Sequence, residues 1–261
     1  MGPGGPEMYM SWWPAGAVAA SLFTCAAQAR PVVAVIDSGV AMTEELRPHL
    51  IGEHDMAADH AREAFKPRYD HGTMVATILT RAARGQVDIL SFRIDDPAGC
   101  PEALTPPCQS SAQPIARAIR KATELGVDAI NISLALKDDP AITAAVRDAT
   151  RKGVFVVLAA GNDGRDAPGN LKIAIAGYPR ATLVGALDAA GRPWIGTNKP
   201  ERVPSGRYSY VWRQGVDVPA SVADGSPVRG TGTSFAAPIE AGLHFYRPPE
   251  ETRAGTVTAA R

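Results

Sequence analysis

Three short segments of this chain each contain one member of a set of side chains that could carry out nucleophilic catalysis. In chain order they are Asp37-Ser38-Gly39, Asp70-His71-Gly72-Thr73 and Gly232-Thr233-Ser234. A serine hydroxyl is a weak nucleophile until an imidazole accepts its proton, and a buried carboxylate must hold that imidazole in the required tautomer. The candidate acid, base and nucleophile are therefore Asp37, His71 and Ser234.

A fourth segment, residues 159–164, contains Asn162. Its side-chain amide could donate a hydrogen bond to an oxygen that develops negative charge, together with the backbone N–H of Ser234. That N–H is expected to be free, because the first N–H groups of a helix lack internal partners. The arrangement would be an oxyanion hole.

Each segment also has a purely structural interpretation. Residues 159–164 could be a plain turn, Asp37 a solvated strand end, His71 a surface residue at a helix start, and Ser234 an N-cap. A helix that starts at His71 would disfavour the imidazolium, and Gly72 is expected to leave room for a substrate beside the ring. The signal lies in the occurrence of all four segments together.

Short apolar runs predict the elements that position these residues. Strands are expected at residues 32–36, 87–94, 129–134, 154–158 and 181–187, with a weaker candidate at 173–176. Helices are expected to begin near His71, Ile115, Pro140 and Ser234. This alternation predicts an α/β fold, with a doubly wound, mostly parallel sheet and helices on both faces. Sites in such sheets lie at the carboxyl ends of strands, where Asp37 and Asn162 fall.

The order of the segments identifies a family resemblance. Asp37-Ser38-Gly39, His71-Gly72-Thr73, Ala160-Gly161-Asn162 and the run from Gly232 to Pro238 together resemble the subtilisin-like serine peptidases, the subtilase family. The resemblance covers roughly residues 31 to 243. It implies endopeptidase activity through an acyl-enzyme. Asp37 would orient His71, which acts as base and then acid; Ser234 would be the nucleophile, and Asn162 would complete the oxyanion hole.

The same resemblance implies a substrate-binding region. Ser133, Leu134 and Ala135 are similar to the family strand that pairs with an extended substrate, and Ala160 and Gly161 are similar to the other wall of the primary specificity pocket. Small side chains there would leave the pocket open to a large apolar residue.

The family usually has a propeptide, and here only residues 31–36 separate the expected mature start from Asp37. The helix after Ser234 is also expected to end early, at Arg247-Pro248-Pro249. The alternative is therefore a catalytically inactive, peptide-binding pseudoprotease of the same fold.

The charge balance and the ionisable residues give no support for nucleic acid binding or for a metal site. Lys and Arg number 27, as do Asp and Glu, so no net charge favours a nucleic acid partner, and the expected partner is a protein or peptide substrate. His54, Asp55, Asp59 and His60 lack a recognised ligand spacing and are expected in a solvated loop. No cofactor or metal site is predicted, while structural calcium, common in the family, and the oligomeric state stay open.

The N-terminal region predicts export. Residues 8–29 carry no charge and end in Ala27-Gln28-Ala29, which is typical of a signal peptide over residues 1–29. A peptidase domain over residues 30–247 and a polar tail over 248–261 would follow. The alternative is an uncleaved membrane anchor. Cys100 and Cys108 then remain as a pair, expected to form a disulfide in an oxidising compartment; two free thiols in a cytosolic loop are the alternative.

Overall fold

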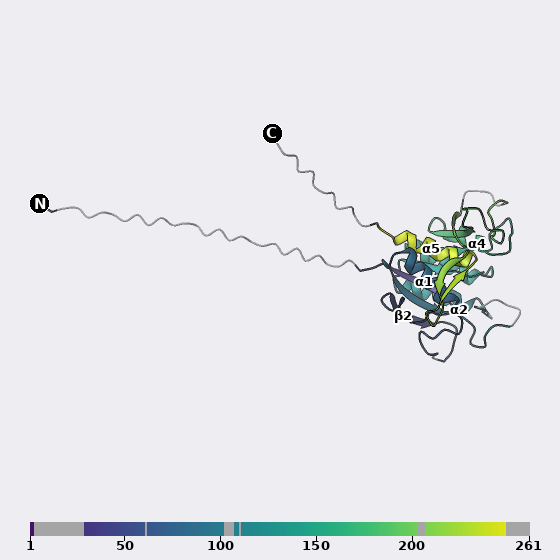
Figure 1. Ribbon diagram of the computed structural model, residues 1–261, viewed down its shortest axis with the longest axis horizontal. Coiled ribbons are helices and arrows are strands. Elements are labelled where there is room, and N and C mark those ends of the chain that lie inside the picture. The colour runs from purple at the N-terminus through teal and green to yellow at the C-terminus, as the bar shows by residue number, and fades with distance from the viewer. Residues whose placement is uncertain (3–28, 61, 102–106, 110, 203–206, 249–261) are drawn as a thin grey trace, which may run out of the picture.

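A sheet of parallel strands lies at the centre of the folded part of the protein (Figure 1). The computed structural model describes residues 1–2, 29–60, 62–101, 107–109, 111–202 and 207–248. The strands are β1 (Val32–Asp37), β2 (Leu50–Asp55), β3 (Asp88–Arg93), β4 (Ala129–Ile132), β5 (Phe155–Ala159), β6 (Ala181–Leu187) and β7 (Ser209–Gln214). Their spatial order is β2-β3-β1-β4-β5-β6-β7, and every neighbouring pair is parallel. The predicted fold class is confirmed.

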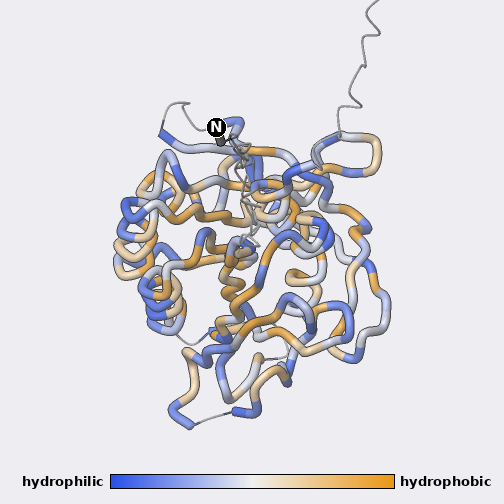
Figure 2. The backbone as a smooth tube through the Cα atoms, turned by 90° about the vertical axis from the view of Figure 1, so that its left-hand side faces the viewer, coloured by the Kyte–Doolittle hydropathy of each residue, from blue (hydrophilic) through white to orange (hydrophobic). Residues whose placement is uncertain are grey.

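Within the described ranges, five helices cover the two faces of the sheet. On one face lie α2 (Gln113–Glu124), α3 (Pro140–Arg151) and α4 (Leu171–Gly177), and on the other lie α1 (His71–Ala82) and α5 (Thr233–Phe245). Side chains alternate along β1, so that Ala34 and Ile36 enter the first core and Val33 and Val35 enter the second. Both faces of β1 are therefore buried, which explains its continuous apolar sequence. In Figure 2, apolar segments run through the interior and hydrophilic ones lie on the periphery.

The ends of the predicted helices follow from local chemistry. Asp139 precedes α3, and its Oδ1 accepts a hydrogen bond from the N–H of Ala141 at 2.7 Å. Pro140 occupies the first turn, where its missing N–H has no cost. Ile142 and Val146 then lie on the buried face of α3. The predicted helix is confirmed by these contacts.

The prediction of a strand at residues 173–176 is wrong, because this segment lies within α4. Ile173 and Ala174 face the core, whereas Ile175 is 41 % exposed. Successive residues of a strand point to opposite faces, so two adjacent buried residues followed by an exposed one fit a helix better. The sequence also missed β2 and β7, which form the two edges of the sheet. Edge strands are half exposed and therefore lack the continuous apolar runs of the central strands.

A second, smaller sheet precedes the last helix. Strands β8 (Val218–Ser221) and β9 (Pro227–Gly230) pair in antiparallel orientation, and neither was predicted. Val218 and Ala220 pack with Ile78 of α1 and Phe235 of α5 in a small core of their own. The hairpin therefore supports the two helices that carry His71 and Ser234.

The winding of the sheet reverses beside β1. The chain runs from β1 outward to β2, returns through β3, and then crosses to β4 on the other side of β1. A site is expected outside the carboxyl ends of strands at such a reversal, here those of β1 and β4. Most of the expected leader and of the C-terminal tail lies outside the described residues. Within the described ranges, no helix combines the length and apolar character needed to cross a membrane.

Candidate active site

The carboxylate of Asp37 and the ring of His71 are joined across 34 positions of sequence. Nδ1 of His71 lies 2.8 Å from Oδ1 and 3.0 Å from Oδ2 of Asp37, so the ring donates its Nδ1–H to this carboxylate. Asp37 is fully buried, and Oδ1 also accepts the N–H of Ser38 at 2.7 Å. This geometry leaves Nε2 of a neutral His71 without a proton and able to accept one.

Ser38 fixes the end of β1 against the start of α1. Its hydroxyl donates to the backbone oxygen of Tyr69 at 3.1 Å and accepts the N–H of Gly72 at 3.1 Å. A Cβ at position 72 would lie 2.2 Å from the backbone oxygen of Gly39. The small size of Gly72 therefore allows α1 to approach β1, and the expectation that it makes room for a substrate is corrected.

The pKa of His71 is determined by two opposing effects. Burial disfavours the charged imidazolium, but the charge of Asp37 and its hydrogen bond to Nδ1 outweigh burial, and the pKa lies above its ordinary value of 6.5. The helix start, expected to disfavour the imidazolium, does not decide the direction. The fully buried Asp37 carboxylate, in direct contact with the ring, raises the pKa of His71 more than the partial charges at the start of α1 lower it.

Ser234 is the second residue of α5, and its side chain is partly exposed. Gly232 precedes the helix with φ of 146°, a conformation that favours glycine and turns the chain sharply into α5. The N–H of Ser234 has no hydrogen-bond partner among the described residues, as the helix start predicts. No hydrogen bond joins the Ser234 hydroxyl to His71 in that part of the chain, and such contacts often tighten only when substrate binds.

Asn162 is held by the residue that precedes Ser234. Its Oδ1 accepts hydrogen bonds from the backbone N of Thr233 at 2.9 Å and from Oγ1 of Thr233 at 2.8 Å. Oγ1 of Thr233 in turn accepts the N–H of Gly161 at 3.1 Å. With Oδ1 occupied, the Nδ2 group is the part of Asn162 left to donate to another molecule. Thr233 is a site residue that the sequence analysis missed.

One cleft of about 460 Å³ brings most of the predicted residues together. Its lining includes six of the predicted catalytic and substrate-binding residues: His71, Ser133, Leu134, Ala135, Asn162 and Ser234. Asp37 lies behind His71. Ala160 and Gly161 are not in the lining, and Ala160 is fully buried. The ring of Phe235 also lines the cleft and lies 5.6 Å from that of His71.

Asn170 connects the two segments expected to form the specificity pocket. Its Nδ2 donates to the backbone oxygen of Leu134 at 2.9 Å and to that of Ala159 at 2.8 Å. Its Oδ1 accepts the N–H of Leu136 at 3.0 Å, and the side chain is buried. All of these contacts span at least 11 positions, so no local sequence signal could have identified Asn170.

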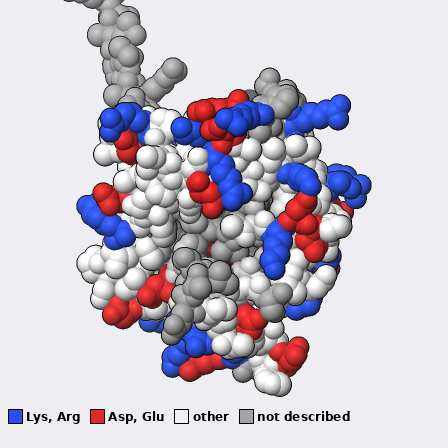
Figure 3. Space-filling view, turned by 90° about the vertical axis from the view of Figure 1, so that its right-hand side faces the viewer, with Lys and Arg blue, Asp and Glu red and all other residues white. Residues whose placement is uncertain are grey.

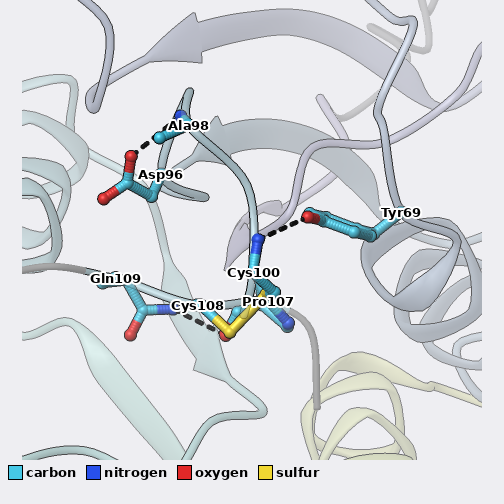
Figure 4. The surroundings of a disulfide bond; sticks show 7 residues. All are labelled: Tyr69, Asp96, Ala98, Cys100, Pro107, Cys108 and Gln109. Atoms are coloured by element: carbon cyan, nitrogen blue, oxygen red, sulfur yellow. Dashed lines mark hydrogen bonds between the residues drawn. A yellow bond between two sulfur atoms is a disulfide. The ribbon is translucent and has the colours of Figure 1, made fainter. Parts of the chain in front are cut away.

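The predicted disulfide between Cys100 and Cys108 is confirmed (Figure 4). The N–H of Cys100 donates to the hydroxyl of Tyr69 at 2.9 Å, which connects the disulfide to the segment before His71. Pro107, Cys108 and Gln109 line the cleft. The disulfide therefore holds one wall of the cleft, a role that the sequence analysis did not predict.

His54 and Asp55, two of the four ionisable residues expected in a loop between β1 and α1, have internal partners. His54 stacks on Phe92 with ring centroids 5.1 Å apart, and Asp55 forms an ion pair with Arg62. His54 and Asp55 belong to β2, which corrects the expected loop at these two positions. No group of three or more metal-ligating side chains comes together in the described part of the chain.

On the face drawn in Figure 3, basic and acidic side chains lie beside one another around uncharged surface.

The doubly wound parallel sheet and its cleft define a subtilisin-like α/β protein. The profile of the subtilase family matches residues 28–244, and the chain belongs to this family. It is 30 % identical over 214 residues to a thermophilic serine proteinase of Bacillus sp. (strain AK1), covering 81 % of this chain and 50 % of that protein. It is 29 % identical to subtilisin-like protease 10 of Trichophyton verrucosum (strain HKI 0517), covering 81 % of this chain and 39 % of that protein.

A solved structure has the same fold. The crystal structure of a cold-adapted subtilisin-like serine proteinase superimposes with a TM-score of 0.65 at 20 % identity, covering 81 % of this chain and 72 % of the other. This likeness shows the fold alone. The chain spans half or less of the length of the two curated relatives above.

Proposed function

We propose that this protein is a serine endopeptidase that hydrolyses peptide bonds through an acyl-enzyme. The observation that carries the proposal is the buried Asp37–His71 pair, with Nδ1 2.8 Å from the carboxylate, in a ring that lines the same cleft as Ser234 and Asn162. Membership of the subtilase family supports the same conclusion.

The first half of the reaction uses the groups in this order. Nε2 of His71 accepts the proton of the Ser234 hydroxyl as Oγ attacks the substrate carbonyl carbon. The carbonyl oxygen gains negative charge and receives hydrogen bonds from the N–H of Ser234 and from Nδ2 of Asn162. The imidazolium is stabilised by Asp37 and then protonates the leaving amine, so that the C–N bond breaks and an ester to Ser234 remains.

The second half repeats the same transfers with water. His71 accepts a proton from water as the water oxygen attacks the ester carbonyl, and the same two donors stabilise the oxyanion. The proton then returns to Oγ, which releases the carboxylic acid product. Every step uses side-chain and backbone groups of this chain, and the proposed reaction includes no cofactor.

A fluorophosphonate probe tests the proposal directly, because an activated serine displaces fluoride from phosphorus and forms a stable ester. We expect wild type to be labelled at Ser234, identified by mass spectrometry of the labelled peptide, and Ser234→Ala not to be labelled. Casein hydrolysis by wild type and not by Ser234→Ala is the second readout. If folded wild type is not labelled by the probe, the proposal is wrong. Peptide binding without turnover would identify a pseudoprotease.

We also propose that the protein is exported. The Cys100–Cys108 disulfide supports an oxidising compartment, and residues 8–29 contain no charged side chain. Expression of the full chain with N-terminal sequencing of the extracytoplasmic fraction tests this. A mature chain that starts near Arg30 is the expected result, whereas recovery of the intact chain in the membrane fraction would favour an uncleaved anchor.

A further inference from the structure

One charged side chain in the cleft has no role in the mechanism above. Among the described residues that line the cleft, Lys137 is the single lysine or arginine, and none of them is Asp or Glu. The Asp37 carboxylate is fully buried and already engaged by His71. Among its described lining residues, the cleft therefore presents a single lysine or arginine charge to whatever enters it.

The acidic residues beside Lys137 in the sequence are engaged elsewhere. Asp138 forms an ion pair with Lys172, and Asp139 accepts the N–H of Ala141 at the start of α3. Within the described part of the chain, no carboxylate lies at ion-pair distance from the Lys137 ammonium. The charge of Lys137 is thus available to a ligand.

The backbone just before Lys137 is anchored by a buried side chain. Asn170 is buried, and it accepts the N–H of Leu136 at 3.0 Å and donates to the backbone oxygen of Leu134 at 2.9 Å. Pro140 starts α3 three residues after Lys137. Lys137 therefore follows directly after an anchored backbone position, and its exposed side chain belongs to the lining of the cleft.

We propose that Lys137 gives the cleft a preference for peptides that carry Asp or Glu close to the scissile bond. The inference rests on the proposed peptidase function and names a substrate class for it. An exposed ammonium attracts a carboxylate only moderately, so the expected preference for Glu over the isosteric Gln is about threefold to fivefold at low salt. Added salt screens the attraction and reduces the preference.

Pairs of peptides that differ only by Glu or Gln test the proposal, with the exchange made in turn at each position flanking the cleaved bond. The readout is the ratio of kcat/KM within each pair. We expect the largest Glu/Gln ratio of wild type to fall to about one in Lys137→Met and below one in Lys137→Glu. Lys152→Glu is the matched control, because it makes the same charge change on an exposed residue at the end of α3. Lys152 lies shortly before the start of β5, whereas the cleft lies at the carboxyl ends of the strands.

A second measurement separates this inference from the peptidase function. Binding of the same peptides to Ser234→Ala, followed by fluorescence anisotropy, reports the preference without turnover, and we expect the same ratio of affinities. A wild-type ratio of one at every position, or a preference that persists in Lys137→Met, would overturn the role of Lys137 while leaving catalysis intact. Failure of wild type to react with a fluorophosphonate would overturn the peptidase function alone.

Discussion

Thr233 donates two hydrogen bonds to one oxygen of Asn162, from its backbone N at 2.9 Å and from its Oγ1 at 2.8 Å. The residue beside the nucleophile thereby orients the candidate oxyanion donor. Asn162→Ala is expected to lower kcat about 100- to 1000-fold with little change in KM, because the lost hydrogen bond forms only as negative charge develops. Thr233→Val should cost about fivefold in kcat, as one of two orienting bonds is lost, and Thr233→Ser should restore it.

These kinetics are measured with a chromogenic peptide and normalised by active-site titration. Asn162→Asp is the informative companion, since it keeps the shape and the acceptor but lacks the donor. Equal losses in kcat for Thr233→Ser and Thr233→Val would contradict the orienting role of the hydroxyl.

The Asp37–His71 pair predicts the effect of removing the carboxylate charge. Asp37→Asn is expected to reduce kcat about 10,000-fold, because the amide can present its N–H to Nδ1 and favour the wrong tautomer. It should also lower the pKa of His71, since only the effect of burial remains once the charge and hydrogen bond of Asp37 are lost. Titration of the His71 ring by NMR in both proteins measures that change. An unchanged pKa would refute the assigned cause.

The raised pKa of His71 predicts the pH dependence of activity. The imidazolium cannot accept a proton from Ser234, so kcat/KM should fall as pH decreases through a pKa above 6.5. Stability follows the opposite course. Because folding raises the pKa of His71, its protonation adds to the free energy of unfolding when the pH is below the pKa of the unfolded state. This contribution is lost as the pH rises through the pKa of the folded state.

The two consequences are checked by a pH profile of kcat/KM and by denaturant unfolding across the same range. His71→Gln serves as the control for unfolding, because it lacks the titrating ring. A midpoint of activity at or below pH 6.5, or no difference between wild type and His71→Gln in the pH dependence of stability, would contradict the assignment.

The Cys100–Cys108 disulfide predicts an effect on binding more than on chemistry. The double variant Cys100→Ser/Cys108→Ser frees the wall formed by Pro107, Cys108 and Gln109, which must then be ordered when substrate binds. We expect KM to rise roughly threefold to tenfold, with kcat changed less. Reduction of wild type should reproduce the effect, and reduction of the double variant should do nothing further. A loss confined to kcat would be inconsistent with this role.

Asn170 predicts a coupled effect on stability and selectivity. Asn170→Ala leaves buried carbonyl oxygens of Leu134 and Ala159 without this partner, and should lower the free energy of unfolding by about 2–5 kcal/mol. It should also reduce discrimination among substrates that differ in the residue before the scissile bond, because the two connected segments can separate. Ile142→Ala in the core under α3 is the control. It should destabilise by a similar amount, about 2–5 kcal/mol, and leave the selectivity profile unchanged.

The central strands and four of the helices were predictable because burial on both faces, or on one helical face, leaves a local pattern. β1 is apolar at every position from Val32 to Ile36, and α3 begins with Asp139-Pro140. The short helix α4 was mistaken for a strand. Its run Ile173-Ala174-Ile175-Ala176 is apolar at every position, so it fits the two-residue repeat of a strand as well as the 3.6-residue repeat of a helix. The edge strands β2 and β7 were not predicted, because half-exposed strands tolerate polar residues and therefore lack a continuous apolar run.

By itself, the sequence determined which groups were available and in what order: Asp37, His71, Asn162 and Ser234, each in a segment with a recognisable motif. The tertiary structure alone decided how these groups are oriented. Thr233 holds Asn162, Asn170 joins Leu134 to Ala159, and Gly72 lets α1 approach β1. The physical reason is that motifs reflect neighbours along the chain, whereas each of these contacts joins residues separated by 11 to 71 positions. Packing of the sheet against its helices brings such residues together.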